Sequence, residues 1–342
     1  MEQVGLNEGR DTTLKGAYWQ YVSSIFTVAV GALFYIFIIH VYTTEIVGVF
    51  ALLSAVATIF SAIFSLGLQT GTQHFISYHL GRGEDGAIKS LIRKMIFFSL
   101  ILSFSSFATV WLLSPLLSSF FFHTFKYIHY LRLIDIEISL MIVTNLLLSM
   151  LLGLQNFKTN GLMLIVNSGI GYGLIAPIFL LYRDPIGILY AWITGYSVSF
   201  TILLAIISMK MRSVKAEEER IRPVLVYSFP IFLSSLIGTG SVYVDRFIVS
   251  FFLNLSELGI YNFSLLIINA MSILTIPFST ILLSKLSEFY GRGDRESFRL
   301  YSEKAVEMIS AVYVPIALLL AALSQSVLLF LANSRYLPGT VP

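Results

Sequence analysis

The sequence is dominated by apolar runs long enough to cross a lipid bilayer, and this feature restricts its fold most. A membrane-spanning helix needs about 20 predominantly apolar residues. Nine such runs lie at residues 16–40, 46–79, 91–113, 137–155, 161–182, 186–209, 224–253, 257–286 and 304–325. Only 12% of the 342 residues are charged, too few to cover the surface of a soluble protein. The backbone of a membrane segment must satisfy its own hydrogen bonds, so we predict an all-α, multi-pass integral membrane protein.

The distribution of Lys and Arg predicts how the chain is oriented. With the N-terminus in the cytoplasm, the inner connections hold 17 of these residues and the outer connections hold four. The remaining one, Arg246, falls within an apolar run. Inner loops of membrane proteins carry an excess of basic residues, so we expect a cell-membrane protein with a cytoplasmic N-terminus.

Three short motifs occur twice in the same order, which predicts a duplicated unit. They pair Ser23-Ser24 with Ser234-Ser235, Gly48-Val49-Phe50 with Gly259-Ile260-Tyr261, and Gly81-Arg82-Gly83 with Gly291-Arg292-Gly293. The offset is 211 residues for the first two pairs and 210 for the third, as in an internal repeat. A shift of six spans preserves orientation, so the two copies are expected to be related by an axis along the membrane normal.

The repeat divides the chain into two predicted lobes. Residues 1–212 form a first lobe of six helices, and residues 224–342 form an incomplete second lobe with three full helices. Residues 213–223 carry the charged run from Lys215 to Arg220 and lack large apolar clusters, so we interpret them as a cytoplasmic linker.

Asp245 and Arg246 are the sharpest functional signal, because they lie inside the seventh apolar run. A charged side chain at the centre of a membrane helix costs about 2.5–3.5 kcal/mol on insertion scales. The functional interpretation is a site for a coupling cation, H⁺ or Na⁺, on Asp245, or for a substrate phosphate on Arg246. The alternative is a local ion pair in which Arg246 extends toward the membrane surface.

Small polar residues recur at helical spacing in the first, second, seventh and eighth runs. We predict a water-filled cleft lined by these four spans. The candidate lining residues are Gln20, Ser24, Thr27, Gln69, Ser241, Asn262 and Asn269. Close helix packing also selects small polar residues and is the competing explanation.

The sequence holds no familiar catalytic motif. It has no cysteine, no P-loop, no His-Glu-x-x-His and no Gly-x-Ser-x-Gly, so we expect no enzymatic activity, no cofactor and no metal site. We also expect no nucleic-acid partner. Asp135 and Glu137, at the outer end of the fourth span, are the thin basis for one alternative, an integral-membrane glycosyltransferase.

Several segments together resemble the polysaccharide flippases, the O-antigen flippase-like family of the multidrug/oligosaccharidyl-lipid/polysaccharide exporter superfamily. The resemblance rests on Leu14-Lys15-Gly16, Glu45–Phe50, Phe75–Tyr78, Tyr243–Ile248, Glu257–Tyr261 and Ser334–Pro338. It spans nearly the whole chain, with loosely defined motifs.

The resemblance implies two six-helix lobes around a central cavity that opens alternately to each side of the membrane. The implied substrate is an oligosaccharide linked to a polyprenyl diphosphate, and Arg246 is the position that fits a cation gripping the diphosphate. Membrane lipids and glycan-assembly membrane proteins are the implied partners. The family has twelve or fourteen helices, so the resemblance also predicts that this chain is a C-terminally truncated fragment.

Two further alternatives stay open. One is a cation-coupled multidrug or toxin exporter of the same superfamily, which would need acidic residues in the cavity of the first lobe. The first two spans hold none inside. The other is an inactive, truncated remnant.

Overall fold

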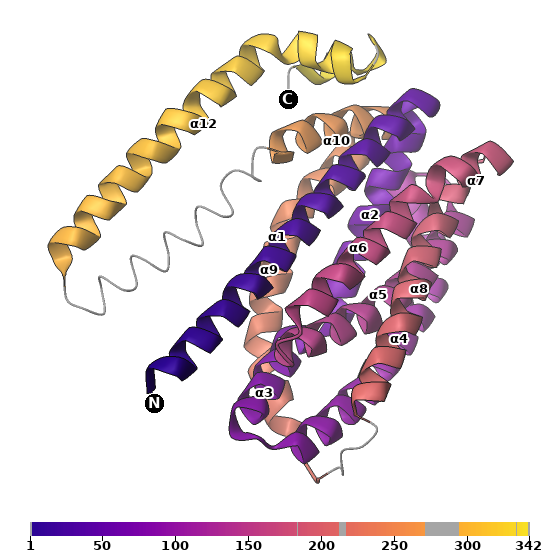
Figure 1. The fold of residues 1–342 in the computed structure, drawn as a ribbon. Helices are drawn as coiled ribbons and strands as arrows, with labels where there is room; N and C mark the ends of the chain where they lie inside the picture. Colours follow the sequence, from indigo (N-terminus) through magenta and orange to yellow (C-terminus); the bar gives the residue numbers. More distant parts are fainter. Residues whose placement is uncertain (1, 183, 212–216, 271–293, 333, 341–342) are drawn as a thin grey trace.

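The computed structural model describes residues 2–182, 184–211, 217–270, 294–332 and 334–340, and its regular structure there is helical (Figure 1). The elements are α1 (Glu2–Val41), α2 (Thr44–Ser65), α3 (Leu68–Arg82), α4 (Asp85–Phe122), α5 (Ile128–Gly153), α6 (Phe157–Gly173), α7 (Ile175–Tyr182), α8 (Gly187–Lys210), α9 (Arg222–Phe252), α10 (Leu255–Ala270), α12 (Arg295–Leu331) and a 3₁₀ helix, η1 (Ser334–Thr340). Within these residues, eight segments are long and apolar enough to cross a membrane. The prediction of an all-α, multi-pass membrane protein is confirmed.

The helices of the first lobe pack into one bundle in which α5 is central. It contacts α2, α3, α4, α6 and α8. Two apolar cores meet along it, one including Leu131 and the other including Leu151. Large apolar side chains on the outside of α4, such as Phe104 and Leu112, are 72% and 76% exposed, as a helix facing lipid requires.

The second lobe joins this bundle through α9 and α10. Helix α9 packs against α2 and α3, and α10 packs against α2. Figure 1 shows α12 away from the bundle, and its main contact is with η1. The predicted eighth span, 257–286, begins as α10, and its remainder lies outside the described residues, as does the Gly291-Arg292-Gly293 copy of the repeat.

The second apolar run, expected as one span over 46–79, is two helices. Helix α2 ends before Leu66 and Gly67, which both adopt left-handed backbone conformations with φ of 48° and 67°. Glycine tolerates this region without a steric penalty. A Cβ on Gly67 would also lie 2.6 Å from the carbonyl oxygen of Ser228 on α9. The break therefore lets α9 approach the chain closely.

Other predicted spans were too short, because charged residues were taken as their ends. Helices α4 and α5 are separated only by residues 123–127, so most of the stretch 114–136 between the predicted third and fourth spans is helical. The Arg132 guanidinium lies 4.7 Å from the ring centre of Trp111, and its Nε donates to Ser114 Oγ over 3.3 Å. Such contacts let a helix retain a charge within its length.

The fifth run, 161–182, is also divided, into α6 and α7, with Leu174 between them. Local capping marks several helix starts. Thr43 Oγ1 accepts from the backbone N–H of Ile46 before α2, and Asn156 Oδ1 accepts from that of Thr159 before α6.

The described part of the predicted linker is 217–223, and its last two residues already belong to α9. Residues 217–221 lie against the cytoplasm-facing end of α4 in our predicted orientation. The backbone N–H of Glu217 donates to the carbonyl of Gly86 over 3.1 Å. Lys94 Nζ donates to the carbonyl of Glu219 over 2.6 Å. The linker residues thus make defined contacts with the first lobe before α9 begins at Arg222.

Candidate functional site

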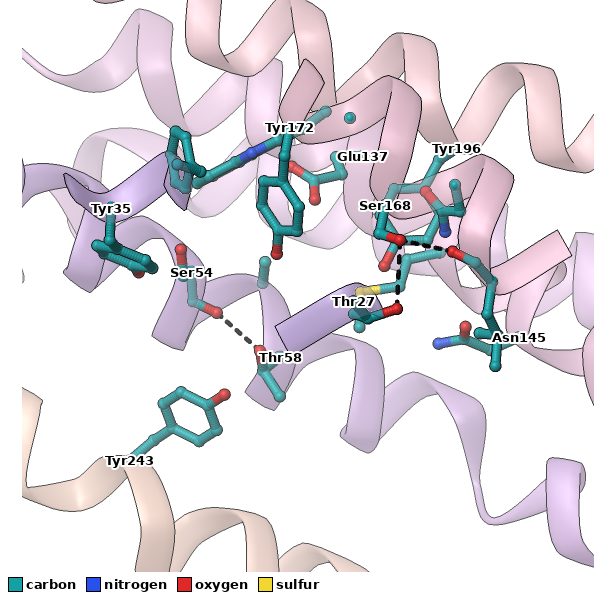
Figure 2. A pocket seen from close by; sticks show the side chains of 17 residues that line it. Thr27, Tyr35, Ser54, Thr58, Glu137, Asn145, Ser168, Tyr172, Tyr196 and Tyr243 are labelled. Atoms are coloured by element: carbon teal, nitrogen blue, oxygen red, sulfur yellow. Dashed lines mark hydrogen bonds between the residues drawn. The ribbon is translucent and has the colours of Figure 1, made fainter. Parts of the chain in front are cut away.

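A cavity of about 360 Å³ lies within the first lobe, among α1, α2, α5, α6 and α8 (Figure 2). Small-molecule pockets commonly enclose about 300–1,000 Å³. The polar and aromatic residues that line it are Thr27, Phe34, Tyr35, Ser54, Thr58, Glu137, Asn145, Asn167, Ser168, Tyr172, Trp192, Tyr196 and Tyr243. Tyr243 is the one lining residue contributed by α9. The wall is therefore rich in both hydrogen-bonding groups and aromatic rings.

This cavity does not coincide with the predicted cleft between the first, second, seventh and eighth spans. Helices α5, α6 and α8 supply much of the lining, and of the seven predicted lining residues only Thr27 belongs to it. The hydroxyl of Thr27 pairs with that of Ser168 over 3.2 Å (Figure 2). Helical periodicity identified polar faces, but it could not tell which faces would be closed by packing.

The other predicted lining residues mostly make local or packing contacts. Gln20 Nε2 donates to Asn160 Oδ1 over 3.0 Å, which joins α1 to α6. The exposed hydroxyls of Ser24 and Ser241 each donate to the carbonyl one turn earlier, over 2.8 Å. Gln69 Nε2 donates to Ser65 Oγ over 3.1 Å. The side chain of Asn269 lies outside the described residues.

Arg246 is held on the inner side of α9 by several partners. Its Nε donates to Asn262 Oδ1 on α10 over 3.0 Å, and its Nη1 donates to the carbonyl of Val242 over 2.8 Å. Its guanidinium carbon lies 4.7 Å from the ring centre of Tyr243. The side chain is only 11% exposed. These contacts hold the guanidinium within the protein, so it does not extend to the membrane surface.

Asp245 forms an ion pair with the neighbouring Arg246, as in the second interpretation of the sequence. Its Oδ1 lies 3.4 Å from Arg246 Nη1, and its Oδ2 accepts from the hydroxyl of Tyr261 on α10 over 3.0 Å. Asp245 is 30% exposed at its side chain. The acid and the base are thus paired with each other and also anchored to α10.

Tyr243 connects this charged cluster to the cavity. Its ring lies 4.7 Å from the guanidinium carbon of Arg246. It also lines the cavity (Figure 2). The hydroxyl of Tyr35, another lining residue, lies close to Asn262. The side chain of Tyr243 therefore lies between Arg246 and the cavity.

Glu137 is a candidate site residue that the sequence analysis did not place in the cavity. It was placed with Asp135 on an outer segment, but α5 begins at Ile128, so Glu137 lies nine residues inside the helix, roughly 13 Å at 1.5 Å per residue. It lines the cavity, is 8% exposed, and its Oε2 has no hydrogen-bond partner within the described residues.

Asp135 is fully buried and does not line the cavity. Residues two apart do not face each other on a helix. The two acids therefore do not form the outer-loop pair on which the glycosyltransferase alternative rested. Within the described part of the chain, no group of three acidic or histidine side chains could hold a metal ion.

A bundle of long apolar helices around a polar and aromatic cavity, with a buried arginine behind one wall, defines a multi-pass membrane protein. Solved structures with a similar fold include transporters of the MOP superfamily. An inward-facing multidrug resistance MATE transporter aligns with a TM-score of 0.75 at 15% identity, over 93% of this chain and 75% of that one. An outward-facing multidrug resistance MATE transporter aligns with a TM-score of 0.65 at 16% identity, over 95% of this chain and 76% of that one. A MOP transporter from Pyrococcus furiosus aligns with a TM-score of 0.66 at 16% identity, over 94% of this chain and 75% of that one.

The chain belongs to the family described as polysaccharide biosynthesis protein, whose model matches residues 43–340. This confirms the resemblance to the polysaccharide exporters of the MOP superfamily. No curated protein matches the sequence significantly.

Proposed function

We propose that the protein moves a polyprenyl-diphosphate-linked oligosaccharide across the cell membrane by alternating access. The observation that carries the proposal is the placement of Arg246, a mostly buried arginine in a membrane helix, directly behind the cavity wall at Tyr243. Arginine binds phosphate oxygens through paired, charge-assisted hydrogen bonds. The Nη2 nitrogen of Arg246 makes no hydrogen bond within the described residues. This guanidinium nitrogen can therefore donate to a phosphate oxygen.

The lipid diphosphate would then lie at the junction of α9 and α10, and the glycan would enter the cavity of the first lobe. The buried ion pair favours this arrangement, because a diphosphate could displace Asp245 from Arg246 while Asp245 keeps its hydrogen bond from Tyr261. In this scheme Asp245 can also take up the coupling cation, H⁺ or Na⁺, when Arg246 engages the substrate.

The proposal includes the orientation and setting inferred from the sequence. The N-terminus is cytoplasmic, the membrane is the plasma membrane, and glycan-assembly membrane proteins supply and receive the substrate. Membership of the polysaccharide biosynthesis family and the transporter fold support a transporter that is not an enzyme.

A flipping assay with the full chain in proteoliposomes tests this function. The substrate is a fluorescent polyprenyl-diphosphate oligosaccharide, and the readout is its protection from a membrane-impermeant quencher. We expect Arg246→Ala to lower the initial rate at least about tenfold, since a hydrogen bond to a charged group contributes about 1.5–3 kcal/mol. Arg246→Lys should retain part of the rate, and Asp245→Asn should alter the cation dependence.

The matched control is Arg299→Ala, which removes an 81% exposed arginine on α12 that pairs with Glu303. It should flip substrate at the wild-type rate. A wild-type rate in a folded Arg246→Ala variant would remove the basis for the proposal.

Glu137 favours a second candidate function, a cation-coupled multidrug exporter. That alternative requires an acid in the cavity of the first lobe, and Glu137 occupies that place. It predicts efflux of a cationic dye such as ethidium, driven by a proton or sodium gradient and lost in Glu137→Gln. Absence of dye efflux under both gradients would exclude it.

A further inference from the structure

Two buried polar groups in the cavity have no hydrogen-bond partner among the described residues, and they are complementary. The Oε2 atom of Glu137 is an acceptor and the Nε1–H of Trp192 is a donor, and neither makes a hydrogen bond within the described residues. Each residue is 8% exposed. Buried polar atoms are normally paired, so two unpaired ones in the same cavity point to a ligand that supplies a donor and an acceptor.

Aromatic rings form much of the surrounding wall. The rings of Phe34 and Tyr172 are stacked, with centres 5.1 Å apart, and Trp192 meets Phe34 edge-on at 5.9 Å. Figure 2 shows Glu137 beside Tyr172, with Ser168 and Tyr196 further along the same wall. Such a wall offers flat apolar surfaces interrupted by hydroxyl, amide and carboxyl groups.

A sugar ring matches this combination chemically. Its C–H faces pack against aromatic rings, and each of its hydroxyls can donate to a carboxylate or accept from an indole N–H. Amides such as those of Asn145 and Asn167 can serve the remaining hydroxyls, because each amide both donates and accepts.

The charge of the lining restricts which sugars fit. Among the lining residues in the described part of the chain, Glu137 is the one Asp or Glu, and there is no Lys, Arg or His. A uronic acid would place a second carboxylate near Glu137 with no cation among these lining residues to offset it. An amino group would instead gain a charge-assisted hydrogen bond.

We infer that this cavity is a saccharide-binding site in which Glu137 and Trp192 hydrogen-bond the sugar, and that it accepts neutral or amino sugars over acidic ones. The inference rests on the proposed function for the identity of the whole substrate, and it assigns that substrate's glycan part. The binding and its charge preference can nevertheless be measured without any transport.

The test measures binding of free disaccharides to the full chain in lipid nanodiscs by ligand-observed NMR. The probes are chitobiose, its de-acetylated diamino form and digalacturonate. We expect the first two to bind and digalacturonate to bind at least tenfold more weakly. Glu137→Gln should reduce this difference to less than threefold, and Trp192→Phe should weaken binding of all three probes.

A second variant acts in the opposite direction. Asn167→Asp adds a second acid to the lining, so it should strengthen binding of the diamino sugar and weaken binding of digalacturonate further. Glu303→Gln, which removes an exposed acid on α12, is the control and should leave all three affinities unchanged. Equal wild-type affinity for neutral and acidic probes would overturn the inference, as would unchanged selectivity in folded Glu137→Gln and Asn167→Asp.

The outcome separates this inference from the proposed function. Selective sugar binding that depends on Glu137, without flipping of lipid-linked substrates, would retain the saccharide site and remove the transport proposal. Flipping that depends on Arg246, with sugar selectivity independent of residue 137, would retain the transport proposal and overturn the saccharide site.

Discussion

Gly48 on α2 and Gly259 on α10 bring two repeat-related helices into direct backbone contact. The Cβ position of each glycine lies 3.0 Å from the backbone nitrogen of the other. A methyl group on Gly48 would collide with the carbonyl of Leu255, and one on Gly259 would collide with that of Thr44. The hydroxyls of Thr44 and Ser256 hydrogen-bond beside this crossing. The two glycines are 211 residues apart, so this near-symmetric contact supports a duplicated unit.

We therefore expect Gly48→Ala and Gly259→Ala each to lower the free energy of unfolding by about 1–3 kcal/mol, the usual cost of overpacking. The measurement is denaturant unfolding in mixed micelles. Gly81→Ala is the control, because nothing lies within 4 Å of its Cβ position, and alanine should stabilise that helix by roughly 0.5–1 kcal/mol. A neutral effect of both core substitutions would contradict the close crossing.

Gly67 and Gly83 form a matched pair for testing the break between α2 and α3. Both have left-handed backbones, with φ of 67° and 71°, so alanine at either site costs about 1–2 kcal/mol from conformation alone. Only Gly67 also faces the α9 backbone at Ser228 and Phe232, whereas nothing lies within 4 Å of the Gly83 Cβ position.

We expect Gly67→Ala to lower the unfolding free energy by at least about 1 kcal/mol more than Gly83→Ala, because only the former is overpacked. Equal losses in the two variants would mean that α9 can move away from the break.

Much of the fold could be predicted from sequence, because hydrophobic length dictates membrane spans directly. The boundaries could not, since they depend on tertiary partners. Arg132 falls between the predicted third and fourth spans, but Trp111 and Ser114 on α4 accommodate it within α5. The division at Leu66 and Gly67 was also missed, because two left-handed residues leave no mark in a hydropathy pattern.

The candidate site was predicted only in part. Arg246 and Asp245 stand out in sequence because charge is rare in apolar runs. Their partners Asn262 and Tyr261 belong to the next helix, and no pattern in α9 points to them. Glu137 was missed because the fourth span was started at that residue, so its burial against α6 and α8 could be known only from packing.

Gln20 was a predicted cavity-lining residue, and the structure joins it to Asn160 in one packing unit. Asn160 is buried, accepts from Gln20 Nε2 over 3.0 Å, and donates through Nδ2 to the carbonyl of Leu148 over 2.9 Å. A double-mutant cycle with Gln20→Leu and Asn160→Leu should give a coupling energy of roughly 0.6 kcal/mol, and no more than about 1.7 kcal/mol, the range of hydrogen bonds between membrane helices.

Neither residue lines the cavity, so both variants should bind the disaccharide probes with wild-type affinity. A coupling energy near zero would show that the bond contributes nothing to packing. Loss of sugar binding in a folded Gln20→Leu variant would show that Gln20 belongs to the binding site after all.

A cluster at the junction of α3 and α4 makes the stability of the protein sensitive to acid. Glu84 accepts from His79 Nδ1 through Oε2 and from Arg82 Nε through Oε1, each over 2.7 Å. The hydrogen bond from His79, followed by that from Arg82, lowers the pKa of Glu84 below its ordinary value of 4.5. Because the folded-state pKa is depressed, the stabilisation is complete above about pH 4.5 and is lost as the pH falls through the folded pKa.

Glu84→Gln removes the titrating carboxylate, so we expect the variant to be less stable than wild type at pH 6 and to lose less stability than wild type between pH 5 and pH 3. The measurement is the midpoint of thermal unfolding in detergent at each pH. Glu307→Gln removes an exposed carboxylate on α12, away from this cluster, and should follow the wild-type curve. If Glu84→Gln also follows that curve, the hydrogen bonds from His79 and Arg82 do not stabilise the folded protein.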